Sequence, residues 1–335
     1  MPISRRRVLA LAGTSVFSKL FAGSLRPAKF NVDRLLDAAS GIPAEVFSRK
    51  YAASATITLF SIPLVSKSGV GTGYTVIEEA AGRSGRTVAI QFGAGSYPER
   101  ARGLNRLGFI QEVAVEDRDA AVDCAYLAFM TTSQEKNLDQ AKKALVKAAD
   151  AVAYTAAQGF GKGDKCSSRV DRLQFPSRYT WRDIHELIGK AREAMAAPGG
   201  EPRELKADGE RLSTFLYAVR RALLDSRQKT TGQIFFNSKR FQLQTWKGKD
   251  PSAGAHFAEK NLAAAGSVMR LNALLTEQRT GENTPFRLWY QEGSEKMPPL
   301  KFEYQARSFL RLSFEADGAA AVPPIHHLLN DRENV

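Results

Sequence analysis

The sequence is poor in the residues that most often hold metal ions. It contains only two cysteines, Cys124 and Cys166, and four histidines. No His-Glu-x-x-His or paired Cys-x-x-Cys arrangement occurs, and no carboxylate-rich loop of the calcium-binding kind is present. We therefore predict no metal site and no bound cofactor.

A signature of nucleophilic catalysis is also missing, since the chain has no Gly-x-Ser-x-Gly elbow. Ser96 follows a glycine-rich stretch that could expose its hydroxyl at a turn. A serine nucleophile needs a base within hydrogen-bond reach, and His256 is the only plausible internal one. We assign no catalytic residue, and a periplasmic serine hydrolase centred on Ser96 and His256 is the alternative function.

Two glycine clusters lack the context of a nucleotide site. The cluster at 69–73 lies between two predicted strands, whereas a dinucleotide fingerprint lies between a strand and a helix. The cluster at 159–163 has no Gly-Lys-Ser/Thr ending. We interpret both clusters as turns.

Long hydrophobic runs are absent as well, because no segment approaches the roughly 18 apolar residues that span a bilayer. The first 24 residues instead read as a twin-arginine signal peptide. Arg5 and Arg6 lie in the pattern Ser-Arg-Arg-x followed by two apolar residues, a weakly apolar run reaches Phe21, and a small-residue triplet ends at Ser24. We expect export to the periplasm or beyond, with no transmembrane anchor after signal removal. A basic tail before an ordinary helix is the alternative.

Negative charge is in short supply. The chain carries 48 Lys and Arg against 35 Asp and Glu, a formal net charge of +13. Residues 1–24 hold four of these cations and no acid, so the mature chain keeps +9. In the envelope such a balance favours a lipid or other anionic amphiphile, or an envelope protein partner, and nucleic acid is not expected there.

The two cysteines leave two alternatives open. In an oxidising compartment Cys124 and Cys166 could form one disulfide, which would close a loop of about 40 residues and contribute on the order of 3–4 kcal/mol. They could equally be two inert thiols.

Strand patterns dominate both ends of the chain, and helical patterns lie between them. Alternating runs predict strands at 51–64, 74–79, 87–92, 109–115, 121–129, 233–236, 241–246, 267–275, 286–290, 300–304 and 309–314. A short helix is expected at 33–39, and capping boxes at Thr132 and Thr180 open two further helices. Residues 211–224 predict another helix.

This order predicts an α+β fold, a large curved antiparallel sheet (an open or partial barrel) with a few packed helices. We expect a signal at 1–24, a linker or helix at 25–49, one domain at 50–317 with a helical insert at about 132–224, and a mobile tail at 318–335. The two strand-rich ends are expected to pair with each other.

Three segments resemble a group of exported bacterial β-rich proteins of unknown function, similar in outline to open-barrel lipoprotein carriers. They are Tyr51 with Ile62-Pro63 and Gly69-Val70-Gly71, the stretch from Leu212 to Arg220, and Leu288-Trp289-Tyr290 with Met297-Pro298-Pro299-Leu300 and Phe302-Glu303-Tyr304. The resemblance covers about 50–317. It implies a curved sheet wrapped around a helix and carries over no catalytic residue.

The last third of the chain is rich in aromatic residues interleaved with cations. On a curved sheet, strand alternation would send the aromatics to the concave face and the cations to the rim. The residues that we predict to bind ligand are Phe241, Trp246, Trp289, Phe302 and Tyr304. We therefore predict a non-enzymatic exported envelope protein that binds an apolar or anionic amphiphilic ligand or an envelope partner, with an ordinary sheet core as the alternative.

Overall fold

The computed structural model describes residues 44–318 except 60–61, 82–84, 102, 118–121, 133–138, 141–150, 164, 177–178, 197–202, 207–211 and 308–309. The predicted signal peptide with Arg5 and Arg6, the helix expected at 33–39 and the tail after 318 lie outside the described residues. So does nearly all of the helix expected to begin at Thr132.

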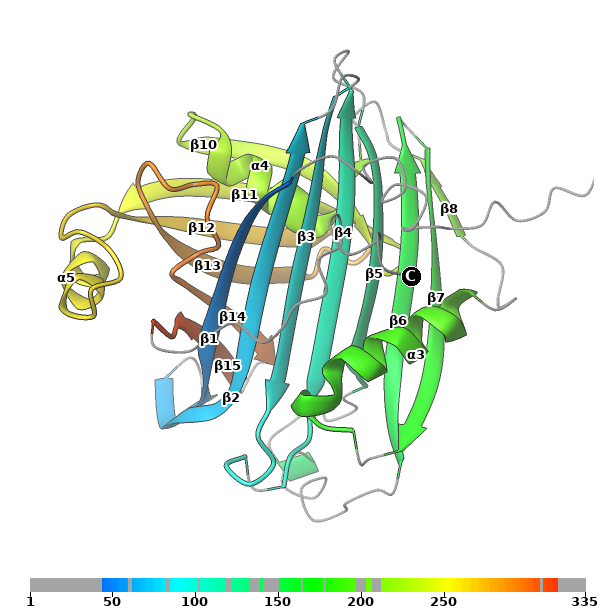
Figure 1. Ribbon diagram of the computed structural model, residues 1–335, viewed down its shortest axis with the longest axis horizontal. Coiled ribbons are helices and arrows are strands. Elements are labelled where there is room, and N and C mark those ends of the chain that lie inside the picture. The colour runs from blue at the N-terminus through cyan, green and yellow to red at the C-terminus, as the bar shows by residue number, and fades with distance from the viewer. Residues whose placement is uncertain are drawn as a thin grey trace, which may run out of the picture. The chain divides into compact units, whose positions relative to one another are not determined.

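One sheet of fifteen strands makes up most of the described chain (Figure 1). Its spatial order is β8-β7-β6-β5-β4-β3-β2-β1-β15-β14-β13-β12-β11-β10-β9. The strands are β1 (Ala44–Leu59), β2 (Ile62–Ala81), β3 (Gly85–Ser96), β4 (Leu107–Asp117), β5 (Val122–Thr131), β6 (Ala151–Lys162), β7 (Lys165–Pro176), β8 (Arg203–Lys206), β9 (Leu212–Ser213), β10 (Lys229–Phe236), β11 (Lys239–Lys249), β12 (Val268–Glu277), β13 (Asn283–Gln291), β14 (Lys301–Arg307) and β15 (Leu310–Ala316). All neighbouring strands are antiparallel except β9 and β10.

The two strand-rich ends of the chain pair as predicted. Strand β1 pairs with β15 over the register that joins Tyr51 to Ala316 and Ile57 to Leu310. This pairing makes one continuous sheet out of the N-terminal half, β1 to β8, and the C-terminal half, β9 to β15. The predicted α+β class with a large antiparallel sheet is thereby confirmed.

Several predicted boundaries are wrong. Strand β1 begins at Ala44, inside the segment expected to be a linker or helix. Strand β2 runs through 69–73, where a turn was expected, and its register with β1 shifts between Ala53 and Ala55. The expected helical insert contains the β6–β7 hairpin, whose many Ala and Gly residues conceal the alternation that marks a strand.

Within the described residues, helices α3 (Ile184–Ala196), α4 (Phe215–Leu224) and α5 (Pro251–Glu259) and the 3-10 helix η1 (Trp181–Asp183) pack on the two faces of the sheet. Helix α4 lies against β3, β4 and β10, and we call the face that it contacts the inner face. The 3-10 helix η1 and α3 pack on the outer face of the N-terminal half, and α5 on that of the C-terminal half. The capping box at Thr180 is present as predicted. Helix α4 begins later than the expected 211, because Leu212 and Ser213 pair with β10.

The chain connection between the edge strands requires the sheet to curl. Only residues 207–211 separate the end of β8 from the start of β9, and a fully extended segment of that length spans at most about 22 Å. A flat sheet of this order would place the two edges roughly 67 Å apart at about 4.8 Å per strand. Accordingly Leu205 of β8, Leu212 of β9 and Phe235 of β10 share one buried cluster. In Figure 1, β10 to β13 run across the long N-terminal strands.

We call this crossing of β10 to β13 over the N-terminal strands the overlap. The tip of the β10–β11 hairpin holds it in place. Asn237 and Ser238 have positive φ values of 53° and 57°, as the two-residue turn of a tight hairpin requires. The Asn237 N–H donates to the Tyr126 hydroxyl at 2.8 Å, and the Ser238 N–H donates to Ser168 Oγ at 3.0 Å. The C-terminal half is thereby hydrogen-bonded to β5 and β7.

Glycines interpreted as turns lie inside strands and make room for rings. A Cβ at Gly159 would lie 2.4 Å from the ring of Tyr126, and a Cβ at Gly161 would lie 3.0 Å from the ring of Phe235. Both glycines belong to β6. Gly71 and Gly73 likewise lie in β2, so the two interpretations as turns are wrong for these positions.

Candidate functional site

The five residues predicted to bind ligand do not share one face. Phe241, Phe302 and Tyr304 point to the inner face, whereas Trp246 and Trp289 point to the outer face. The cause is the period of two along a strand, which places Phe241 and Trp246 on opposite sides of β11. The structure therefore does not assemble them into one groove.

Phe302 and Tyr304 belong to a packed aromatic cluster on the inner face. The ring of Phe302 lies 4.6 Å from Phe314, 5.0 Å from Phe92 and 5.1 Å from Tyr51, measured between ring centroids. Burial raises the pKa of Tyr304 to about 12. Side chains thus fill the place where the concave groove was expected.

Trp289 and Trp246 differ in their surroundings. The Trp289 indole N–H donates to Asp250 Oδ2 at 3.0 Å, and Lys301 lies 5.2 Å from its ring centroid. Because Asp250 also caps the N-terminus of α5, this contact fixes the helix on the sheet. Trp246 is 44% exposed and lies on β11, which is separated from the strand of Trp289 by β12.

Cys124 and Cys166 are free, buried thiols, so the structure does not contain the disulfide that the sequence left open. Cys124 faces Gly161 across β5 and β6, and Gly161 faces Cys166 across β6 and β7. Two strands separated by a third lie roughly 10 Å apart, beyond the span of a disulfide. Burial raises the pKa of both thiols, that of Cys166 to about 12.

Ser96 and His256 are not brought together. Ser96 Oγ donates to the Leu104 carbonyl at 2.6 Å and accepts from the Arg106 N–H at 2.8 Å, so it anchors the 97–106 loop. His256 lies on α5 with Nε2 at 2.8 Å from Glu315. Register places Ser96 on the inner face, whereas α5 packs on the outer face. The pair required by the hydrolase alternative is therefore not formed.

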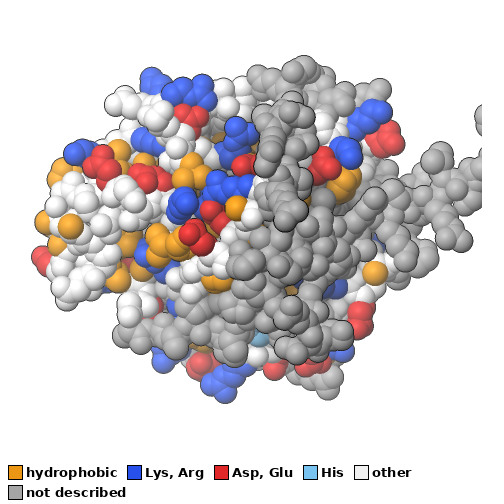
Figure 2. All heavy atoms as spheres, turned by 45° about the horizontal axis from the view of Figure 1, so that its top comes forward, with side chains coloured by type: hydrophobic (Ala, Val, Ile, Leu, Met, Phe, Trp, Pro, Cys, Tyr) orange, Lys and Arg blue, Asp and Glu red, His pale blue; other side chains and the backbone are white. Residues whose placement is uncertain are grey.

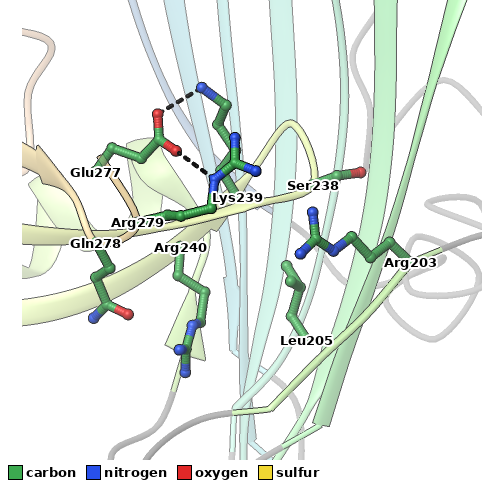
Figure 3. Close-up of a pocket in the computed structure, with 8 residues that line it drawn as sticks. All are labelled: Arg203, Leu205, Ser238, Lys239, Arg240, Glu277, Gln278 and Arg279. Carbon is green, nitrogen blue, oxygen red and sulfur yellow. Dashed lines mark hydrogen bonds and ion pairs between the residues drawn. The ribbon is translucent and has the colours of Figure 1, made fainter. Parts of the chain in front are cut away.

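Where β8 passes the C-terminal hairpins, there is a cavity of about 270 Å³, and half of its lining residues are cations (Figure 3). Its lining residues come from three segments and are Arg203 and Leu205 of β8, Ser238, Lys239 and Arg240 at the β10–β11 turn, and Glu277, Gln278 and Arg279 at the end of β12. The four cations and one acid give the lining a net formal charge of +3. This basic cavity is the candidate functional site.

Glu277 organises two of the cations. Its side chain is 3% exposed, Lys239 Nζ lies 2.6 Å from Oε2, and Arg279 Nε lies 3.8 Å from Oε1. The hydrogen bond from Lys239 lowers the pKa of Glu277, against the opposing effect of its burial. Glu277 is therefore ionised at neutral pH and holds the two cations at the cavity wall.

The backbone of two other segments brings the remaining two cations, Arg240 and Arg203, to the cavity wall. The hairpin turn docked on Tyr126 and Ser168 sets the position of Arg240, and the Gln278 N–H donates to the Arg240 carbonyl at 3.0 Å. Arg203 enters from β8, which pairs with β7 in the other half of the sheet. The described part of the chain offers no hydrogen bond or ion pair to the Arg203 guanidinium.

One of the cations could be found from local sequence and another could not. Arg240 is among the cations interleaved with the aromatic residues of the last third. The contribution of Arg203 depends on the curl of the sheet, which no local pattern indicates. Among the described residues, no group of three His, Cys, Asp or Glu side chains could hold a metal ion, and no helix has the length and apolar character needed to cross a bilayer.

Three comparisons with known proteins gave a similarity among solved structures alone. No family model matches the chain, and no curated protein matches it. Among solved structures, the chain is similar to the beta-barrel-like protein of Domain of Unknown Function DUF1849 from Brucella abortus, with a TM-score of 0.43 and 10% sequence identity over 82% of this chain and 96% of that chain. The chain is a β-rich protein with a likeness to a beta-barrel-like protein of unknown function.

Proposed function

We propose that this protein is a non-enzymatic binding protein of the bacterial envelope that holds an anionic ligand in the basic cavity. The observation that carries the proposal is the lining of the cavity of about 270 Å³. It contains four cations, Arg203, Lys239, Arg240 and Arg279, and one acid, Glu277. A cluster of like charges destabilises the protein that contains it, so a bound anion would stabilise this arrangement.

The cation types favour a phosphate-bearing ligand. Three of the four cations are arginines, whose planar guanidinium groups bind phosphate and carboxylate oxygens through paired N–H donors. A phosphate monoester or diester carries the negative charge and the several acceptor oxygens that such a cluster can use. We take the headgroup of an anionic phospholipid as the ligand class, in keeping with the amphiphile expected from composition.

Export supports the envelope location. The twin-arginine pattern at Arg5 and Arg6, followed by a weakly apolar run and small residues, is the motivating feature. Intact mass of the protein recovered from the producing cell checks this part separately, because loss of about the first 24 residues is expected on export.

Isothermal titration with two ligands tests the binding proposal. We expect glycerol 3-phosphate to bind weakly and short-chain phosphatidylglycerol more tightly. The double variant Arg203→Gln/Arg279→Gln should weaken binding about tenfold or more, because it removes two charge-assisted contacts. Lys239 is left in place, since its loss would leave the buried Glu277 without its closest partner.

Arg227→Gln is the matched control. Arg227 is an exposed arginine that pairs with Asp225 outside the cavity, so its replacement should leave binding unchanged. Binding of both ligands would place recognition in the headgroup, and binding of the lipid alone would make the acyl chains part of it. If neither ligand binds, or if the double variant binds as tightly as the wild type, the proposal is overturned.

A further inference from the structure

A second surface, distinct from the basic cavity, surrounds Trp246 on the outer face of the C-terminal half. The chain has three tryptophans, of which Trp181 and Trp289 are 9% and 6% exposed, whereas Trp246 is 44% exposed. Its neighbour Thr245 is buried on the inner face, so alternation along β11 directs the Trp246 indole away from α4.

Register aligns two cations with this indole. Lys229 pairs with Trp246, Trp246 with Asn272, and Asn272 with Arg287. Directly paired residues of antiparallel strands share a face, so these four side chains form one row across β10 to β13. Lys229 and Arg287 are exposed, and within the described chain neither has a hydrogen bond or ion pair. Figure 2 shows one face of the molecule. In the part that is not grey, Lys and Arg side chains lie beside hydrophobic, Asp and Glu side chains.

Two rows of the same face adjoin this one: the row on one side contains Arg270, which pairs with Asp250, and the row toward the β10–β11 turn carries no charge. The uncharged row consists of Thr231, Gln244, Leu274 and Pro285, in the register of the same four strands. Its two polar members, Gln244 and Thr231, are exposed. The surface around the indole therefore offers amides, a hydroxyl and two cations, beside the apolar side chains of Leu274 and Pro285.

We propose that this row, Lys229–Trp246–Asn272–Arg287, binds a strand of anionic polysaccharide. The flat C–H face of a pyranose ring packs on an indole, amide groups hydrogen-bond to sugar hydroxyls, and the two cations complement carboxylates on neighbouring sugars. Lys229 and Arg287 lie three strand spacings apart, roughly 14 Å, so a repeating anion satisfies both cations where one small anion would reach a single cation.

Oligogalacturonate, a chain of linked uronic acids, is a suitable probe, and neutral malto-oligosaccharide is its uncharged counterpart. We expect oligogalacturonate to protect tryptophan fluorescence from acrylamide quenching and to bind less tightly as salt is raised. Binding should weaken about tenfold or more in Trp246→Ala and several-fold in Arg287→Gln. Malto-oligosaccharide should bind more weakly than the anionic chain.

Met130→Ala is the matched control, because Met130 is also an exposed apolar side chain, 54% exposed on β5. Circular dichroism and thermal unfolding check that Trp246→Ala stays folded, as expected for an exposed position. Equal binding by Trp246→Ala, no binding of oligogalacturonate, or binding of phosphatidylglycerol vesicles through Trp246 in its place would overturn the proposal.

Discussion

The two halves of the sheet use glycine in opposite ways. In the N-terminal half, a Cβ at Gly93 would lie 2.7 Å from the Tyr74 ring, and one at Gly159 would lie 2.4 Å from the Tyr126 ring. In the C-terminal half, a Cβ at Gly232 or Gly248 would meet no atom within 4 Å. Glycines in the N-terminal half therefore make room for aromatic rings, whereas Gly232 and Gly248 in the C-terminal half do not. One of these rings, Phe235 at Gly159 and Gly161, comes from β10 of the C-terminal half.

Helix α4 connects the halves through a buried ion pair. Arg220 pairs with Glu79 of β2 and donates to the Lys296 carbonyl in the C-terminal half at 2.7 Å. We expect the largest loss of stability in the series, about 3–5 kcal/mol, for Arg220→Met, because Glu79 would lose its buried partner and keep only the more exposed Arg86. Denaturant unfolding measures this change.

Arg227→Met is the control for that prediction. Arg227 pairs with Asp225 in an exposed position, and its loss should not change the unfolding midpoint measurably. Similar effects for the two variants would show that α4 does not hold the halves together.

Gly159→Ala should produce the next largest effect. The added methyl group would collide with the Tyr126 ring and also approach Phe235, so we expect a loss of about 2–3 kcal/mol. Gly232→Ala, in open space on β10, should be neutral or slightly stabilising, because alanine restricts the unfolded chain. Equal and small effects at both positions in chemical denaturation would remove the contrast between the halves.

Glu112, on β4 of the N-terminal half, should make the free energy of unfolding depend on pH. Burial raises its pKa from 4.5 to about 7, although the Tyr217 N–H at the start of α4 donates to it at 2.9 Å. Because the folded-state pKa lies above that of the unfolded chain, its stabilising contribution is complete below about pH 4.5 and is lost as the pH rises through 7. Between pH 5 and pH 8 the loss amounts to about 2–3 kcal/mol.

Glu112→Gln isolates this contribution, since the amide keeps an acceptor for α4 but does not titrate in this range. The stability difference between the wild type and Glu112→Gln, measured at pH 5 and pH 8, should shift in favour of the variant at pH 8. A difference that is independent of pH would contradict the assignment.

Tyr126→Phe should have the smallest effect of the four, about 1–2 kcal/mol. The variant keeps the ring that fills the space over Gly159 but removes the hydroxyl that accepts from Asn237 and contacts Ser168 at 2.5 Å. Thermal unfolding measures the loss, and Tyr97→Phe, a partly buried tyrosine outside this overlap, is a suitable comparison. An equal shift in both variants would mean that the hairpin tip contributes nothing specific.

The sequence predicted the strands of the last third and the pairing of the two ends of the chain, but it did not predict the β6–β7 hairpin or the approach of β8 to β12. Alternation located all six strands expected in the last third, and the capping box at Thr180 located a helix start. The sequence pattern could not show that Gly159 and Gly161 lie inside a strand, because one of the rings that occupy the space beside them, Phe235, comes from β10. Nor could it bring Arg203 to Arg240, since that approach depends on the curl of the whole sheet.

The most direct test of this account is the distance between the two ends of the sheet. Spin labels on Glu204→Cys and Gln278→Cys, both exposed, would report it by pulsed electron resonance, and the native thiols are buried. Because β8 and the end of β12 line one cavity, the account predicts a separation below about 25 Å, while a flat sheet with eleven strand spacings between them would give roughly 53 Å. A distance near the longer value would contradict the overlap and, with it, the basic cavity.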